Sequence, residues 1–207
     1  MKLYLNIAQR LTQFNQMVHH LNTCDTPILT VGLSDIHKAH FIYATAQELK
    51  QPILVLTDDE AAAKRMCDDI NIMNGSKEFA YLYPSRDFTF RQMETASKEY
   101  EQIRIGILSR ILNEECPICF CSAEALLQYT IPPEELRNRT FFIRLNQSYK
   151  LDDLIEKLVR AGYTRRPQVE GIAQFSVRGG ILDIFPPNSN APVRMEFWGD
   201  EVDMLSY

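Results

Sequence analysis

The chain has 207 residues, of which 45% are hydrophobic and 24% charged, a composition typical of a globular protein and not of a disordered one. A length of this size predicts one large domain or two small ones. The formal net charge of −5 argues against a generally basic, nucleic-acid-binding body, and no apolar run reaches the roughly 18 residues that a membrane helix needs. We therefore expect a cytoplasmic protein with no membrane contact and with weak DNA binding at most.

The first half of the chain alternates short apolar runs with stretches of helical spacing. Strands are expected at Ile28–Val31, Ile53–Thr57, Phe79–Tyr83 and Cys116–Ser122, and helices at Met1–Leu21, Ala39–Leu49, Glu60–Ile72, Thr95–Leu112 and Ala123–Leu127. Short, wholly apolar strands separated by helices are typical of a parallel sheet covered on both faces. Residues 1–133 are therefore predicted to form an α/β domain with a parallel sheet.

The second half changes character after Pro132-Pro133. A strand at Phe141–Leu145 and a helix at Leu151–Ala161, ended by Gly162, are expected first. A period of two then predicts strands at Gln174–Arg178, Ile181–Phe185, Val193–Trp198 and Glu201–Leu205. Residues 140–207 are predicted to form a small α+β domain, with one helix on an antiparallel sheet.

Three of the five cysteines lie in the run 116–121, which contains a C-x-x-C pair. Such a pair can hold zinc, but a structural zinc site needs four ligands and no second pair is present. The alternative is a buried strand that uses cysteine as a small apolar residue. We predict reduced thiols and no metal site.

The segment that follows residues 28–31 stands where an α/β nucleotide-binding protein keeps its phosphate loop, with the pattern G-x-x-x-x-G-K-[ST]. Gly32 and Lys38 occupy their places in this pattern. His37 replaces the second glycine, and Ala39 replaces the hydroxyl residue that would bind Mg²⁺. We interpret the loop as degenerate and predict that Gly32, His37, Lys38 and Ala39 form no working ATP site.

Three stretches of the second half carry a family resemblance: AGY at 161–163, VRGGILDIFP at 177–186 and VRMEFWGDEVD at 193–203. They resemble the second domain of UvrB and, more closely, the UvrB-like N-terminal module of bacterial transcription-repair coupling factors (Mfd). The first half is similar more loosely, through Tyr83-Pro84-Ser85 and the helix after it. The resemblance thus implies a helicase-like first domain followed by a UvrA-binding second domain.

Two departures separate this chain from UvrB itself. UvrB keeps an intact phosphate loop, and it inserts a long aromatic hairpin that clamps damaged DNA. Only about ten residues separate Pro84 from the helix expected at Thr95, too few for that clamp at ~3.3 Å per strand residue. The coupling-factor module is similar to this chain on both counts, so a UvrB fragment is the alternative.

Strand alternation places Arg194, Glu196 and Trp198 on the face opposite the core. Arginine and tryptophan are enriched at binding hot spots, although an Arg–Glu surface pair beside a half-covered tryptophan is an equally good interpretation of this pattern. The resemblance implies that the face binds UvrA. The residues that match the contacting positions of the family are Arg178, Arg194 and Trp198, with Tyr163, Arg165 and Arg166 as an extension.

Taken with the resemblance, these features predict a non-catalytic adaptor that recruits UvrA to stalled RNA polymerase for nucleotide-excision repair. We expect the chain to be part of a much longer protein that binds RNA polymerase and double-stranded DNA and hydrolyses ATP with Mg²⁺, while this part holds no cofactor. The alternatives are a fragment of a UvrB-type ATP-dependent repair subunit and a scaffold domain that serves only its own polypeptide.

Overall fold

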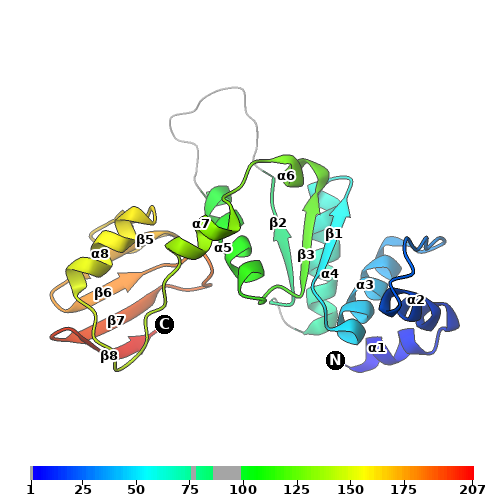
Figure 1. The fold of residues 1–207 in the computed structure, drawn as a ribbon, viewed down its shortest axis with the longest axis horizontal. Coiled ribbons are helices and arrows are strands. Elements are labelled where there is room, and N and C mark those ends of the chain that lie inside the picture. The colour runs from blue at the N-terminus through cyan, green and yellow to red at the C-terminus, as the bar shows by residue number, and fades with distance from the viewer. Residues whose placement is uncertain (1, 76–77, 86–98) are drawn as a thin grey trace. The chain divides into compact units, whose positions relative to one another are not determined.

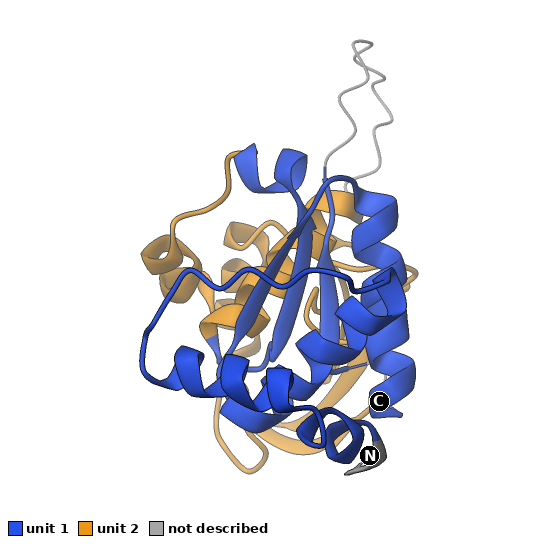
Figure 2. Ribbon diagram, turned by 90° about the vertical axis from the view of Figure 1, so that its right-hand side faces the viewer, with its two compact units in different colours: residues 1–88, 113–128 blue, residues 89–112, 129–207 orange. Residues whose placement is uncertain are grey.

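A computed structural model describes residues 2–75, 78–85 and 99–207 (Figure 1). It divides into two compact units, residues 1–88 with 113–128 and residues 89–112 with 129–207 (Figure 2). The predicted domain limits, 1–133 and 140–207, stay a prediction. Helix α5 (Glu99–Leu112) groups with the second unit, although it precedes residue 133. The start of this helix at Thr95 and the short clamp region both fall in 86–98, outside the described residues.

Unit 1 is built on a parallel sheet, as the apolar strand pattern predicts. Its strands are β1 (Ile53–Thr57), β2 (Ala80–Tyr83) and β3 (Ile118–Ser122), in the order β1-β3-β2. Helix α4 (Glu60–Asn74) contacts all three strands. Asp59 caps this helix, since its carboxylate accepts a 2.6 Å hydrogen bond from the Ala62 N–H.

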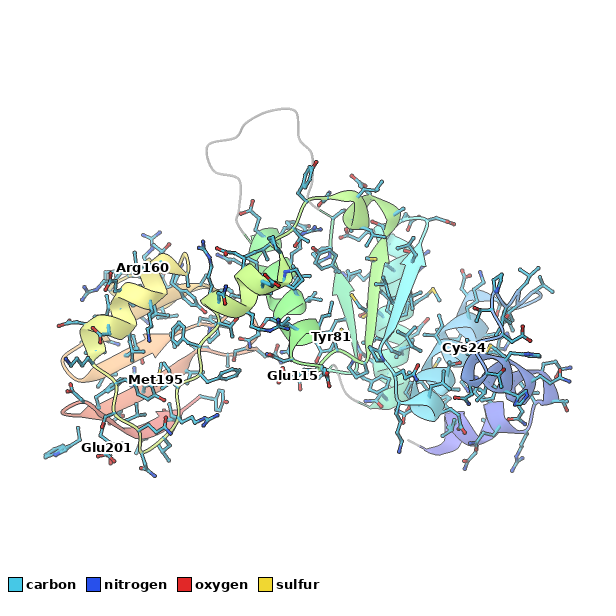
Figure 3. All side chains as sticks on the ribbon, in the orientation of Figure 1. Cys24, Tyr81, Glu115, Arg160, Met195 and Glu201 are labelled. Atoms are coloured by element: carbon cyan, nitrogen blue, oxygen red, sulfur yellow. The ribbon has the colours of Figure 1, made fainter. Side chains whose placement is uncertain are left out.

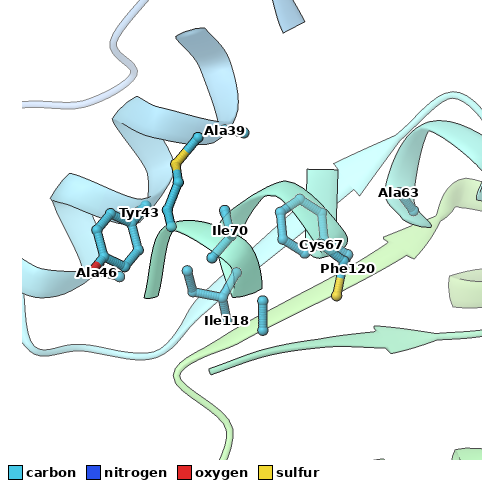
Figure 4. Packing of buried hydrophobic residues seen from close by; sticks show 10 residues of the cluster. Ala39, Tyr43, Ala46, Ala63, Cys67, Ile70, Ile118 and Phe120 are labelled. Carbon is cyan, nitrogen blue, oxygen red and sulfur yellow. The ribbon is translucent and has the colours of Figure 1, made fainter. Parts of the chain in front are cut away.

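A second layer of helices covers α4. Helix α3 (Asp35–Leu49) packs on α4, and its Ala39 and Tyr43 side chains meet Ile70 of α4 in one buried cluster with Ile118 and Phe120 of β3 (Figure 4). The short helix α6 (Ala123–Leu127) follows β3 directly.

The segment expected to be one helix over Met1–Leu21 is two helices, α1 (Lys2–Gln9) and α2 (Thr12–Asn22). The backbone of Leu11 is extended, and the Asn15 side chain donates a 2.8 Å hydrogen bond to the Gln9 carbonyl at the end of α1. The bend allows Ala8 and Phe14 to pack in the same small core with Ala44 of α3. The single-helix prediction was wrong because apolar spacing alone does not report this break.

The strand expected at Ile28–Val31 is also absent from the described sheets, and the segment is an irregular stretch. Leu29 is 87% exposed and Val31 77% exposed, so neither side chain packs in a core. β-propensity measures the fit of a side chain to a packed, pleated surface, and here no neighbouring surface receives it. The first sheet therefore has three described strands and not four.

Unit 2 places a helix on one face of a five-stranded sheet (Figure 1). Its elements besides α5 are α7 (Pro133–Arg139), α8 (Leu151–Arg160), β4 (Thr164–Arg165), β5 (Gln174–Arg178), β6 (Ile181–Ile184), β7 (Val193–Trp198) and β8 (Glu201–Ser206). Leu154 and Leu158 of α8 pack against Phe175, Leu182 and Met195 of the sheet. Gly162 follows α8 with a φ of +91°, as expected of a residue that ends a helix.

Two details of this second sheet differ from the sequence prediction. Strand β4 has only two residues and pairs with β5 in parallel, so the sheet is mixed and not purely antiparallel. The segment Phe141–Leu145 is not a strand: Phe141 and Ile143 do pack against the core, but its backbone joins no ladder of the described sheet. Two alternating side chains of the segment thus face the core, but the segment has no hydrogen-bonding neighbour in the sheet.

Helix α5 is fixed to the connection between β6 and β7. The Arg110 guanidinium donates a 2.7 Å hydrogen bond to the Asn188 carbonyl. One turn earlier, the helix passes so close to the backbone that a Cβ on Gly106 would lie 2.2 Å from the Pro187 carbonyl oxygen. Glycine is required at this crossing because no larger residue fits.

We predict that Gly106→Ala lowers the free energy of unfolding by roughly 1–2 kcal/mol. Alanine stabilises a helix by about 1 kcal/mol relative to glycine, but the backbone clash costs more. Chemical denaturation measures the difference. The control is Gly171→Ala, whose Cβ would meet only the flexible Gln174 side chain at 3.4 Å and should change stability by less than about 0.5 kcal/mol. A stabilised Gly106→Ala variant would contradict the close crossing.

Candidate functional site

The outer face of the second sheet is the face that α8 does not cover. Along β7, Met195 and Phe197 pack with the core, so Arg194 and Trp198 point away from it. The register between β7 and β8 skips one residue, since Glu196 pairs with Met204 and Phe197 with Val202. The extra residue lies on β8, so the alternation of β7 is kept.

Two arginines and one aspartate meet on this outer face, and we call them the Arg–Asp–Arg cluster. Asp183 lies on β6, directly opposite Arg194 of β7. Arg194 donates from Nε to Oδ1 at 2.7 Å and from Nη2 to Oδ2 at 3.0 Å. Arg178, at the end of β5, donates from Nη2 to Oδ2 at 3.2 Å. One carboxylate thus holds two guanidinium groups from different strands.

The cluster is oriented with its carboxylate inward and its cations outward. The Asp183 side chain is 13% exposed, whereas those of Arg178 and Arg194 are 59% and 46% exposed. The hydrogen bonds and positive charge of Arg194 and then of Arg178 hold the pKa of the Asp183 carboxyl below its ordinary value of 3.8, against the opposing effect of burial. The same carboxylate raises the pKa of Arg194. The cluster therefore stays ionised and carries a net charge of +1.

Trp198 lies further along the same strand. It is 85% exposed and pairs in register with Glu201, the first residue of β8. Figure 3 labels Glu201 on the second sheet. Four strand residues correspond to about 13 Å, so the indole extends the cluster and does not stack directly over it. The face as a whole offers cations at one end and a large aromatic surface at the other.

The remaining residues of the predicted patch lie before β5. Arg165 and Arg166 are exposed, and the Arg166 N–H donates to the Phe175 carbonyl at 2.8 Å. Tyr163 packs against the core of unit 2, and burial raises its pKa to about 12. Tyr163 is thus a partly buried packing residue, and its contact with UvrA stays a prediction.

The sequence interpretation did not single out Asp183. It considered a surface pair between Arg194 and Glu196, whereas the ion pair that Arg194 forms in the structure is with Asp183. The available signal was the alternation of β6, which turns Asp183 away from the apolar face that carries Leu182 and Ile184. Its partners could not be predicted because they depend on the register of three strands.

The segment interpreted from the sequence as a degenerate phosphate loop lies at the start of α3. Lys38 donates a 3.0 Å hydrogen bond to the Asp35 carboxylate, and this contact lowers the pKa of Asp35. A hydrogen bond of 2.9 Å joins Ser34 Oγ and His37 Nδ1. Ala39 is fully buried in the core of unit 1. The lysine is thus occupied by a carboxylate, and the position of the metal ligand serves packing.

A large open cavity of about 1030 Å³ borders this loop. Its lining includes two cations, Lys38 and Arg65, and four carboxylates: Asp35, Asp58, Asp59 and Asp69. Nucleotide phosphates bring negative charge, which this lining would repel. Together with Ala39, the excess of carboxylates supports the prediction that this loop forms no site for ATP with Mg²⁺.

No group of three or more His, Cys, Asp or Glu side chains in the described part of the chain is arranged to hold a metal ion. The same residues contain no helix that is both long and apolar enough to cross a bilayer.

Comparison with known proteins gives the family context of the outer face. The family described as the UvrB interaction domain matches residues 141–207, which contain the whole Arg–Asp–Arg cluster. The transcription-repair-coupling factor of Bacillus subtilis (strain 168) is 30% identical over 192 residues, which is 93% of this chain. This chain is homologous to the N-terminal UvrB-like module of transcription-repair coupling factors.

Further relatives of the UvrB-like module agree. The transcription-repair-coupling factors of Staphylococcus aureus (strain USA300) and Staphylococcus haemolyticus (strain JCSC1435) are 28% and 27% identical over 92% and 98% of the chain. The chain spans only 16–17% of the length of these relatives. The similarity therefore concerns one region of long proteins.

We predict that the UvrB-like module does not bind ATP with Mg²⁺ at sub-millimolar concentrations, because Lys38 is paired with Asp35 and Ala39 offers no oxygen ligand. Isothermal titration calorimetry measures this directly. Binding that disappears in Lys38→Ala would show that the loop still works.

We also predict that Asp183→Asn removes a pH-dependent part of the stability of the module. Because the folded pKa of Asp183 is lowered, the ion pair stabilises the fold above the unfolded pKa, and this contribution is lost as the pH falls through the folded value. The variant should be less stable than the wild type by roughly 1–2 kcal/mol at pH 6. The difference should shrink as the pH falls below about 4. Denaturant unfolding from pH 6 to pH 3 tests this, and a difference that does not change with pH would contradict it.

Proposed function

We propose that this module is a non-catalytic adaptor that binds UvrA through the outer face of its second sheet. The observation that supports the proposal most directly is the Arg–Asp–Arg cluster, which holds two exposed guanidinium groups in place inside a region that matches the UvrB interaction domain. Trp198 adds a large exposed aromatic side chain to the same face. Arginine and tryptophan are the residue types that contribute most at protein interfaces.

We further propose that UvrA is recruited where RNA polymerase has stalled, so that nucleotide-excision repair begins there. The name of these relatives, transcription-repair-coupling factor, is the basis of this step. We propose that contact with the polymerase, movement on double-stranded DNA and hydrolysis of ATP belong to other regions of such long proteins. With a net charge of −5, this module is expected to bind DNA weakly at most.

The adaptor proposal predicts that Arg178→Ala, Arg194→Ala and Trp198→Ala each weaken UvrA binding by roughly 1–3 kcal/mol. The double variant of the two arginines should not be additive, because they share Asp183. Affinity is measured by calorimetry with purified UvrA, and the melting temperature of every variant is measured in parallel.

Two controls separate loss of contact from loss of fold. Arg160→Ala removes one exposed arginine from α8, on the other side of the module, and should leave the affinity unchanged. Phe197→Ala removes a side chain that packs with the core, and should lower stability by roughly 3–5 kcal/mol. Normal affinity in all three outer-face variants would leave a scaffold within its own polypeptide as the better interpretation.

A further inference from the structure

We propose that Asp183 is a positioning residue for partner binding: it holds Arg178 and Arg194 as one preorganised pair of donors for a carboxylate on the partner. This inference rests on the proposed function and deepens it, because it gives the chemistry of the partner surface. It also gives a positioning role to an acidic residue that lies between two arginines.

Asp183 lies in the middle of a row that crosses four strands, with Ser176 on one side and Arg194 and Ser206 on the other. Arg194 approaches side-on and makes two hydrogen bonds to separate carboxylate oxygens, at 2.7 and 3.0 Å. A bidentate contact of this kind fixes the plane of the guanidinium group and not only its position.

Both arginines have N–H donors that Asp183 does not use. Arg194 gives Asp183 two of its five N–H groups and Arg178 gives it one, so most donors of both side chains lie outside the pair. Both guanidinium groups border water, whereas the carboxylate is 13% exposed. The free edges of the two cations are thus available to an acceptor on another molecule.

A hollow lies beside the Arg–Asp–Arg cluster. Arg178, Asp183 and Arg194 line a shallow hollow of about 280 Å³, together with Gln168 and Val169. The segment that carries these two residues is fixed to the sheet, since the Ser176 hydroxyl donates a 2.9 Å hydrogen bond to the Pro167 carbonyl. The volume is below the range of ordinary small-molecule sites and suits an inserted side chain. Aspartate or glutamate of the partner fits both its size and its charge.

Positioning and simple attraction predict opposite results for the same change. If the site attracted an acidic partner by net charge alone, Asp183→Asn would raise the charge of the cluster from +1 to +2 and strengthen binding. If Asp183 orders the arginines, its loss releases two long side chains, which must then be immobilised on binding. Binding should therefore weaken, although the site has become more positive.

Glu196→Gln is the matched control. Glu196 lies on the same outer face of β7 and influences Arg194 through its charge, while the hydrogen-bonded partner of Arg194 is Asp183. The substitution changes the charge of the face by the same amount without removing a holding contact. We expect Asp183→Asn to weaken UvrA binding about tenfold or more, and Glu196→Gln to strengthen it by up to about threefold because the face becomes more positive while Asp183 still holds Arg194.

The experiment measures UvrA affinity for the wild type and both variants, the melting temperature of each, and the Nε–H NMR signal of Arg194 in the free module. We expect this signal to be protected from exchange in the wild type and in Glu196→Gln, and lost in Asp183→Asn. Equal or stronger binding by Asp183→Asn, or a protected Arg194 signal in that variant, would overturn the inference. Failure of the wild type to bind UvrA would overturn the proposed function, and the NMR signal would still decide whether Asp183 orders the arginines.

Discussion

Burial of one face of the second sheet under α8 is the constraint on which the interaction site depends. Leu154 and Leu158 bring an apolar surface that only Phe175, Leu182 and their neighbours can cover. Because successive strand residues point to opposite faces, fixing these inward residues also fixes which residues face outward. A one-residue slip of β6 would exchange Leu182 with Asp183 and bury a carboxylate. The packing of the core thus determines the composition of the outer face.

The Arg–Asp–Arg cluster brings two positive charges close together, and Asp183 lies between them. Two arginines on the strands that flank β6 repel each other and lose side-chain entropy when they bind a partner. A shared carboxylate offsets the repulsion and restricts both side chains before any partner arrives. The arrangement adds modestly to stability, since exposed ion pairs contribute little to it. Its main effect is on the geometry that the partner meets.

The sequence predicted the strands whose side chains follow a clear apolar pattern. It did not predict which apolar segments lack a strand partner. The strands of the second sheet from Gln174 onward follow the period of two. The apolar run of β3 is buried throughout, and β1 was recognised from its apolar run although Leu54 and Leu56 are exposed. Residues 28–31 and 141–145 are mostly apolar, as the observed strands are, but they have no strand partner. No local sequence pattern reveals the lack of a partner. The outward position of Arg194 and Trp198 followed from alternation. The role of Asp183 did not, because it depends on the register of β5, β6 and β7.

The unpaired stretch before α3 also has a consequence for the behaviour of the protein in solution. Leu29 and Val31 are exposed in an irregular segment, and β1, an edge of the described sheet, exposes Leu54 and Leu56 by 59% and 53%. Exposed apolar residues next to a free strand edge favour edge-to-edge pairing between molecules. Unit 1 therefore has an apolar surface at which edge-to-edge pairing can start. A charged residue in place of Leu29 or Val31 would improve solubility without disturbing the outer face of unit 2.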